Sequence, residues 1–269
     1  MLGIGNSATD ISVETSRVSH MTYLAMRRGA HVVPKYIAGT PVTELATDFT
    51  SRLPFAFTRW QFNRVLKTAQ GRMEDFGLPT PDHRLGEAHP TVSSDLLPRI
   101  GHGRITVKPN IERIAGASVH FVDGTAAEID TIVWCTGYRI SFPFLAAEQM
   151  HAENNRVSLY RQVVHPEQAG LYFIGLVQPL GAIMPVAEGQ CEWVADLLEG
   201  RAALPEPELM QIEIERDQAR MRKRYVASPR HTIQVDFHPY MRVLRRERKR
   251  TRGVTRALTA AARPTPVAA

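Results

Sequence analysis

The sequence predicts an α/β fold, and three observations indicate that class. A glycine-rich turn with the sequence GIGNSA occupies residues 3–8 and leads into a helical segment. Apolar runs of strand length, at 21–25, 129–134 and 171–174, alternate with longer segments of helical pattern. Hydrophobic residues make up 43% of the 269 residues, which is enough for a globular core. Such an alternation is typical of parallel sheets covered by helices.

The first elements predict a βαβ unit of the kind that binds dinucleotides. The helical run after the turn extends to about Val18, and an apolar strand follows from Met21 to Ala25. In such a unit the first glycine permits a tight turn, the second lets the backbone approach a pyrophosphate, and a small third residue lets the helix pack closely. The predicted cofactor-binding residues of the turn are Gly3, Gly5, Asn6, Ser7 and Ala8. An ordinary glycine turn before a helix is the alternative.

The residues at the end of the second strand indicate whether the unit binds NADH or NADPH. NAD-binding domains place an acid about 20 residues after the glycine turn, where it accepts hydrogen bonds from the ribose hydroxyls. No acid lies between Ser16 and Lys35, and Arg27 and Arg28 stand at the strand end instead. Two guanidinium groups suit a 2′-phosphate, because they form bidentate charge-assisted hydrogen bonds. We therefore predict NADPH, with a solvated arginine pair on a loop as the alternative.

The middle of the chain changes from a helical pattern to strands. Residues 42–78 are mostly helical in pattern, and prolines mark a loop region at 79–90. A β-meander is predicted next, with Asp123-Gly124 as a hairpin turn. Its predicted strands lie within 105–114, 118–124 and 129–134. The run 131–134 is apolar at nearly every position, as expected for a strand that is buried on both faces.

The second half adds one predicted strand and one long helix. The apolar run 171–174 predicts a second strand buried on both faces, and the helix follows from about Met184 to Leu198. The core-facing residues predicted for this helix are Ala187, Cys191, Val194 and Leu198. Cys135 and Cys191 are expected to be small buried hydrophobes, and two cysteines cannot form a disulfide framework.

Two further polar clusters favour structural interpretations. Ser93-Ser94-Asp95 is typical of a helix N-cap rather than of a nucleophile. His231 and His238 lack the neighbouring ligands of a zinc site. We predict neither a metal site nor a catalytic residue in this chain.

The basic character of the chain is concentrated near its end. The formal net charge is +6, and the segment 242–256 carries eight Lys or Arg against Glu247 alone, so the rest of the chain is near neutral. We predict a basic, disordered tail at 242–269, with weak contact to nucleic acid or anionic lipid as the alternative. No apolar stretch reaches the length of a transmembrane helix, and no secretory leader is evident. A cytoplasmic protein without a nucleic-acid partner is expected.

Several long segments resemble the flavin-containing monooxygenase family. GIGNSATDISVE, YLAMRRGAHVVPK, HPTVSSDLLPRIGHGRITVKPNIERI, FVDGTAAEIDTIVWCTGY, LYFIGLVQPLGAIMPVAEGQCEWVADLLEG and KRYVASPRHTIQVDFHPYM follow the family's order from Gly3 to about Met241. The resemblance implies a two-dinucleotide-binding-domain flavoprotein fold. Residues 1–140 would form a Rossmann-like NADPH domain with a helical insert and a β-meander, and 141–241 the C-terminal part of the FAD domain.

The resemblance also implies the cofactors and the reaction. NADPH and FAD would support oxygenation by O₂ of a small organic substrate at a nitrogen, sulfur or carbonyl centre. Thr136 and Gly137 would lie near both cofactors where the chain returns to the FAD domain, and Gln178, in a loop, would face the flavin. A loop amide that caps nearby backbone is the alternative for Gln178.

One departure from the family pattern limits this implication. The sequence contains one glycine-rich dinucleotide turn, which corresponds to the family's second, so the front of the FAD site is missing. We expect a truncated enzyme that is inactive alone. The alternatives are an incomplete gene model, a non-catalytic NADP(H)-binding module, and one half of a split flavoenzyme. The expected protein partner is a second copy of the chain or the missing N-terminal half.

Overall fold

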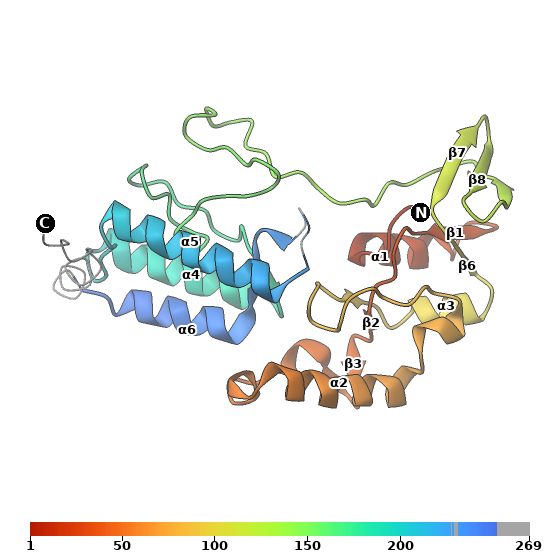
Figure 1. Ribbon diagram of the computed structural model, residues 1–269, viewed down its shortest axis with the longest axis horizontal. Helices are drawn as coiled ribbons and strands as arrows, with labels where there is room; N and C mark the ends of the chain where they lie inside the picture. Colours follow the sequence, from red (N-terminus) through yellow and green to blue (C-terminus); the bar gives the residue numbers. More distant parts are fainter. Residues whose placement is uncertain (227, 229–230, 252–269) are drawn as a thin grey trace, which may run out of the picture. The chain divides into compact units, whose positions relative to one another are not determined.

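The computed structural model describes residues 1–226, 228 and 231–251, and it divides the chain into two compact units (Figure 1). Unit 1 is Met1–Tyr138 and unit 2 is Arg139–Ala269. Each is a mixture of helices and strands, as the α/β prediction requires. The assignment of the units to nucleotide-binding domains stays a prediction.

Unit 1 is built around a run of parallel strand pairings. Strand β1 (Thr22–Ala25) pairs in parallel with β6 (Ile105–Lys108) on one side. On its other side Ala25 bridges Leu2, which in turn forms a parallel bridge with Trp134. Helices α1 (Asn6–Thr15) and α3 (Leu96–Gly101) contribute to the core beside this run. That core contains Ala8, Leu24, Leu96 and Ile105, each at most 1% exposed.

A second set of short elements completes unit 1. Strands β2 (Val32–Val33) and β5 (Thr91–Val92) pair in parallel, and β3 (Tyr36–Ile37) and β4 (Thr40–Pro41) pair in antiparallel fashion. The helical region predicted at 42–78 consists of α2 and three short 3₁₀ helices. Their bounds are η1 (Val42–Glu44), η2 (Thr50–Arg52), α2 (Phe55–Gln70) and η3 (Met73–Phe76).

The predicted β-meander is present, but the bounds of its first and third strands are wrong. Strands β7 (Ile111–Ala115), β8 (Ser118–Phe121) and β9 (Ala126–Glu128) form one antiparallel sheet. Asp123-Gly124 forms the predicted turn, in which Gly124 has φ +81°. The segment 105–108 instead joins the parallel run as β6. The run 131–134 forms only the Leu2 bridge, and Trp134 is 60% exposed, so burial on both faces is wrong.

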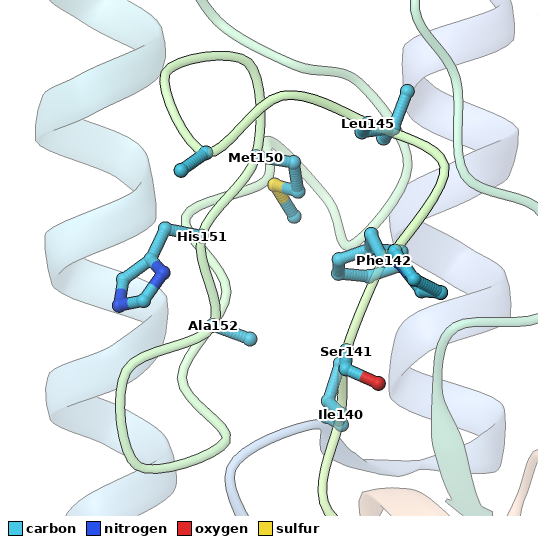
Figure 2. Close-up of a pocket in the computed structure, with 9 residues that line it drawn as sticks. Ile140, Ser141, Phe142, Leu145, Met150, His151 and Ala152 are labelled. Atoms are coloured by element: carbon cyan, nitrogen blue, oxygen red, sulfur yellow. The ribbon is translucent and has the colours of Figure 1, made fainter.

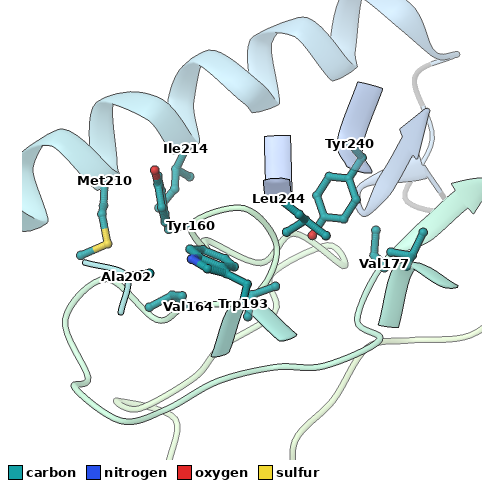
Figure 3. Packing of buried hydrophobic residues seen from close by; sticks show 11 residues of the cluster. Tyr160, Val164, Val177, Trp193, Ala202, Met210, Ile214, Tyr240 and Leu244 are labelled. Atoms are coloured by element: carbon teal, nitrogen blue, oxygen red, sulfur yellow. The ribbon is translucent and has the colours of Figure 1, made fainter. Parts of the chain in front are cut away.

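Unit 2 is dominated by three helices. They are α4 (Ile183–Leu198), α5 (Pro207–Arg224) and α6 (Phe237–Arg248), which run beside one another in Figure 1. The short strands β10 (Gln178–Leu180) and β11 (Gln234–Asp236) pair in parallel. Figure 3 shows the shared core, in which Trp193 of α4 lies among side chains from the other helices and from the segment that contains Tyr160.

Two predictions for unit 2 are corrected by the structure. Residues 171–174 form no regular strand: Tyr172 makes a single antiparallel bridge with Val164, and Ile174 is 42% exposed. The predicted helix at 184–198 is confirmed as α4, but its buried face is different. The buried residues are Val186, Gly189, Gln190, Trp193 and Asp196. Cys191 is exposed, so the prediction of a buried cysteine is wrong there, while Cys135 is half-buried.

The predicted disordered tail is wrong for its first part. Residues 242–248 belong to α6, whose Leu244 and Glu247 are almost completely buried. The Glu247 carboxylate accepts hydrogen bonds from the Tyr160 hydroxyl at 2.8 Å and from Arg161 Nε at 3.0 Å. These contacts fix the helix to unit 2. Residues 249–251 follow this helix without regular secondary structure, and the rest of the predicted tail, 252–269, lies outside the described residues. Among the residues that the structure describes, no helix is long and apolar enough to cross a bilayer.

Candidate functional site

The glycine turn is closed by backbone pairing on both sides. Gly3 N donates to the Ala25 carbonyl oxygen at 2.8 Å, and Cys135 N donates to the Leu2 carbonyl oxygen at 2.9 Å. Gly3 has φ +128°, and a Cβ atom there would lie 2.4 Å from the Cys135 carbonyl oxygen. Only glycine fits this position, because the backbone conformation and the missing space both exclude a side chain.

Helix α1 begins directly after this turn, with an uncapped N-terminus. Gly5 is the N-cap residue, it provides no side-chain hydrogen bond, and the first turn contains no acid. The first backbone N–H groups of a helix have no partner within the helix, and the helix dipole adds partial positive charge at this end. Ala8 is fully buried, which lets α1 lie close to the strands. The arrangement can hold an anionic group such as a pyrophosphate.

Asn6 and Thr91 tie the turn to the end of β5. The Asn6 Oδ1 atom accepts a hydrogen bond from Val92 N at 2.7 Å, and the Thr91 hydroxyl donates to the Ile4 carbonyl oxygen at 2.5 Å. Asn6 therefore fixes the shape of the turn with its side-chain oxygen. Ser7 is exposed at the start of α1.

The two arginines follow the strand that pairs with the turn. Met1 and Gly3 hydrogen-bond to Ala25 at the end of β1, so Arg27 emerges two residues beyond that pairing. Both guanidinium groups are exposed, and Arg28 Nε lies 3.5 Å from Asp82 Oδ2. Within the described part of the chain, Arg27 has no hydrogen-bond or ion-pair partner. A free cation thus stands beside the turn, where an anionic ligand could pair with it.

Thr136 and Gly137 leave the same edge of the strands. They follow Cys135, whose backbone pairs with Leu2, and both are exposed. Gly137 has φ +110°, and a Cβ atom there would meet nothing within 4 Å. The segments that contain Leu2, β1 and Trp134 run in parallel, so their carboxyl ends lie at the same edge of unit 1. The glycine turn, the arginines and Thr136-Gly137 follow these carboxyl ends and therefore lie at that edge. Their role in cofactor binding stays a prediction.

Gln178 belongs to unit 2, and its predicted loop position is wrong. It is the first residue of β10, where its backbone N–H donates to the Ile233 carbonyl oxygen at 2.8 Å. Its side chain is half-buried. Helix α4 starts soon after it from the N-cap residue Ala182, which makes no side-chain hydrogen bond. Its role beside a flavin stays a prediction.

Sequence reasoning missed one charged residue beside the arginines. Asp82 lies in the proline-rich region 79–90, which the sequence predicts only as a loop. It reaches Arg28 through the fold, so spacing after the glycine turn could not have found it. The two prolines that precede it, at 79 and 81, are the available signal, because they indicate a stiff segment.

A separate hollow lies in unit 2. The segment 140–152 encloses a pocket of about 280 Å³ that is lined mainly by apolar side chains, among them Phe142, Leu145 and Met150 (Figure 2). None of the predicted site residues lines it. In the described part of the chain, no group of three or more His, Cys, Asp or Glu side chains is arranged to hold a metal ion.

Known proteins resemble this chain over most of its length. The family model for flavin-binding monooxygenase-like proteins matches residues 1–250. The chain belongs to this family. Flavin-containing monooxygenase 5 from Oryctolagus cuniculus is 38% identical over 245 residues, which cover 88% of this chain and 46% of that protein. Dimethylaniline monooxygenase (N-oxide-forming) 2 from the same organism is 34% identical over 223 residues, which cover 80% of this chain and 41% of that protein.

A solved structure supports the same fold. The S-allyl-L-cysteine S-oxygenase from Allium sativum superimposes with a TM-score of 0.56 at 22% identity, and the match covers 93% of this chain and 44% of that one. The family model, which matches residues 1–250, confirms the predicted family. Family members are NADPH-dependent oxygenases that use FAD and NADPH. The chain spans less than half the length of the relatives it matches.

Proposed function

We propose that unit 1 binds NADPH at the edge formed by the glycine turn, and that the chain provides the nicotinamide-nucleotide-binding part of an NADPH- and FAD-dependent monooxygenase. One observation carries this proposal: the uncapped N-terminus of α1 and the free Arg27 leave the same edge of parallel strands. An anion-binding helix end and a cation at a strand end are the two groups that a phosphorylated dinucleotide requires.

Each part of the nucleotide has a counterpart among these residues. The backbone N–H groups at the start of α1 would hold the pyrophosphate, and Gly3 and Gly5 would let it approach. Arg27 would bind the 2′-phosphate by charge-assisted hydrogen bonds, with Arg28 beside it. Thr136 and Gly137 would border the nicotinamide side of the same edge. The strand order β6, β1, Leu2, Trp134 supports a Rossmann-like arrangement.

The residues available for FAD lie in unit 2. Gln178 would face the flavin ring, and the uncapped start of α4, which has no acid in its first turn, would stabilise negative charge on the flavin. Gln190 supports this region, because its side chain accepts a hydrogen bond from Gly175 N at 2.8 Å and donates one to the Tyr240 hydroxyl at 2.8 Å. The one glycine turn in the sequence is assigned to NADPH, so the FAD pyrophosphate would need binding residues other than this turn.

Bound FAD would supply the oxygen-activating chemistry. The chain would orient NADPH and neutralise the negative charges of the NADPH phosphates. The expected substrate is a small organic molecule that is oxygenated at nitrogen, sulfur or a carbonyl centre. The names of two relatives, an N-oxide-forming enzyme and an S-oxygenase, favour the first two kinds of centre.

The test is calorimetric titration of the chain with NADP⁺ and with NAD⁺. Reversing both charges in the double variant Arg27→Glu/Arg28→Glu should weaken NADP⁺ binding by about 100-fold or more, because hydrogen bonds to charged groups contribute about 1.5–3 kcal/mol each. Binding of NAD⁺ should change little. Arg104→Glu is the matched control, since Arg104 is exposed and immediately precedes the amino end of β6. Equal NADP⁺ affinity in the double variant and the control would refute the proposal.

A further inference from the structure

The loop at residues 79–83 is fixed against the segment that follows β1. Gly29 is buried, and a Cβ atom there would lie 2.1 Å from the Pro79 carbonyl oxygen, so the two backbones are in direct contact. The His31 ring nitrogen Nε2 lies 2.8 Å from the His83 carbonyl oxygen. Two contacts therefore hold this loop beside the arginine pair, and Asp82 lies between them in the sequence.

Asp82 carries a negative charge at this position. Its Oδ1 atom lies 3.0 Å from His83 Nδ1 and its Oδ2 atom 3.5 Å from Arg28 Nε. The hydrogen bond with His83 and the charge of Arg28 hold the pKa of Asp82 below its ordinary value. The carboxylate is therefore ionised at neutral pH. The next acid along the chain, Glu87, is committed elsewhere, because it bonds to Arg59 at 3.2 Å and to Arg84 N at 2.9 Å.

We propose that Asp82 is a specificity-determining residue that moderates the preference of this chain for NADPH over NADH. It occupies Arg28 in the free protein and competes with the 2′-phosphate for that guanidinium group. A phosphate ester carries between one and two negative charges near neutral pH, so the 2′-phosphate and the carboxylate compete for the same guanidinium group. NADH has a 2′-hydroxyl in place of the phosphate and meets no such competition. This inference rests on the proposed function.

The two arginines therefore differ in their availability to the 2′-phosphate. Arg27 is free to meet the phosphate, whereas Arg28 must first exchange one anion for another. The side chains of Arg28 and Asp82 are both more than half exposed, so water and salt weaken the ion pair. The replacement of Asp82 by the 2′-phosphate at Arg28 is therefore easily reversed. Asp82 thus lowers the NADPH preference below what two free arginines would give, without abolishing it.

The experiment measures the NADP⁺ and NAD⁺ affinities of the whole chain by calorimetry in low salt. Asp82→Asn keeps the shape of the side chain and its capacity to accept a hydrogen bond from His83. It should raise the NADP⁺ affinity by about fivefold, the upper range for an exposed pair, and leave the NAD⁺ affinity unchanged. Asp82→Glu keeps the charge and should retain the wild-type ratio. Asp130→Asn is the matched control, because Asp130 is exposed at the opposite end of the strands.

A double-mutant cycle separates a specific role from a structural one. If Asp82 acts through Arg28, the gain from Asp82→Asn should largely disappear in an Arg28→Ala background. A wild-type chain that binds no NADP⁺ would refute the proposed function. A wild-type chain that binds NADP⁺, but whose Asp82→Asn variant keeps the same ratio of the two affinities, would refute this inference alone. A gain that persists without Arg28 would also refute it.

Discussion

Replacement of Gly3 by alanine tests how strictly the turn requires glycine. The new Cβ atom would lie 2.4 Å from the Cys135 carbonyl oxygen, about 1 Å inside ordinary contact, and the obstacle is backbone rather than a flexible side chain. Overpacking of this kind costs about 1–3 kcal/mol. The positive φ of +128° adds about 1–3 kcal/mol for a residue with a side chain. Gly3→Ala should therefore lower the free energy of unfolding of unit 1 by about 2–6 kcal/mol.

The comparison with a second glycine isolates the contact from the backbone strain. Gly116, in the turn between β7 and β8, has φ +62° and open space around its Cβ position. Gly116→Ala should cost only about 1–2 kcal/mol. Urea denaturation followed by circular dichroism gives both values, and an NADP⁺ titration should reveal weaker binding for Gly3→Ala alone. Equal destabilisation by the two variants, or a Gly3→Ala variant with wild-type stability and NADP⁺ affinity, would contradict the described turn.

Two further predictions concern unit 2. Trp193 is fully buried, so Trp193→Ala should lower the free energy of unfolding by about 3–5 kcal/mol in urea denaturation. Within the described residues its indole N–H has no partner, so Trp193→Phe loses no hydrogen bond, leaves a smaller cavity and should cost less than Trp193→Ala. Equal losses would contradict this packing. Hydrogen bonds from Arg248 and Arg201 lower the pKa of Asp196, so its stabilisation is present above the ordinary aspartate pKa of about 3.9 and is lost as the pH falls through the lowered value. In a plot of the free energy of unfolding against pH, Asp196→Asn should reduce the loss of stability at acid pH. An unchanged loss at acid pH would show that the carboxylate is not stabilising.

Much of the candidate site follows from local sequence rules. The glycine turn, helix α1 and the strand before Arg27 are set by residues within a few positions of one another, so their pattern predicts them directly. Helix α4 and the Asp123-Gly124 turn follow for the same reason. The convergence of Thr136-Gly137 with the turn was predicted from the family resemblance, since residues so far apart have no local signal.

The failed predictions share a physical cause, which is that burial depends on partners elsewhere in the chain. The buried face of α4 was misjudged because Gln190 and Asp196 are polar; each is buried because it has hydrogen-bond partners from distant residues. The apolar run 131–134 lacks a ladder because Leu2 alone bridges it among the described residues. The start of the basic segment 242–269 looked solvated, yet Leu244 and Glu247 pack against unit 2.

Hydrogen exchange of the chain with and without NADP⁺ tests whether the glycine turn and the arginine pair bind the nucleotide. We expect slower exchange of the backbone amides at 3–8, where the pyrophosphate would bind, and at 27–28 and 136–137. NAD⁺ should protect the first of these segments and leave 27–28 almost unchanged. Protection by NADP⁺ that is confined to unit 2, or no protection of the glycine turn at saturating NADP⁺, would show that unit 1 does not bind the nucleotide at this turn.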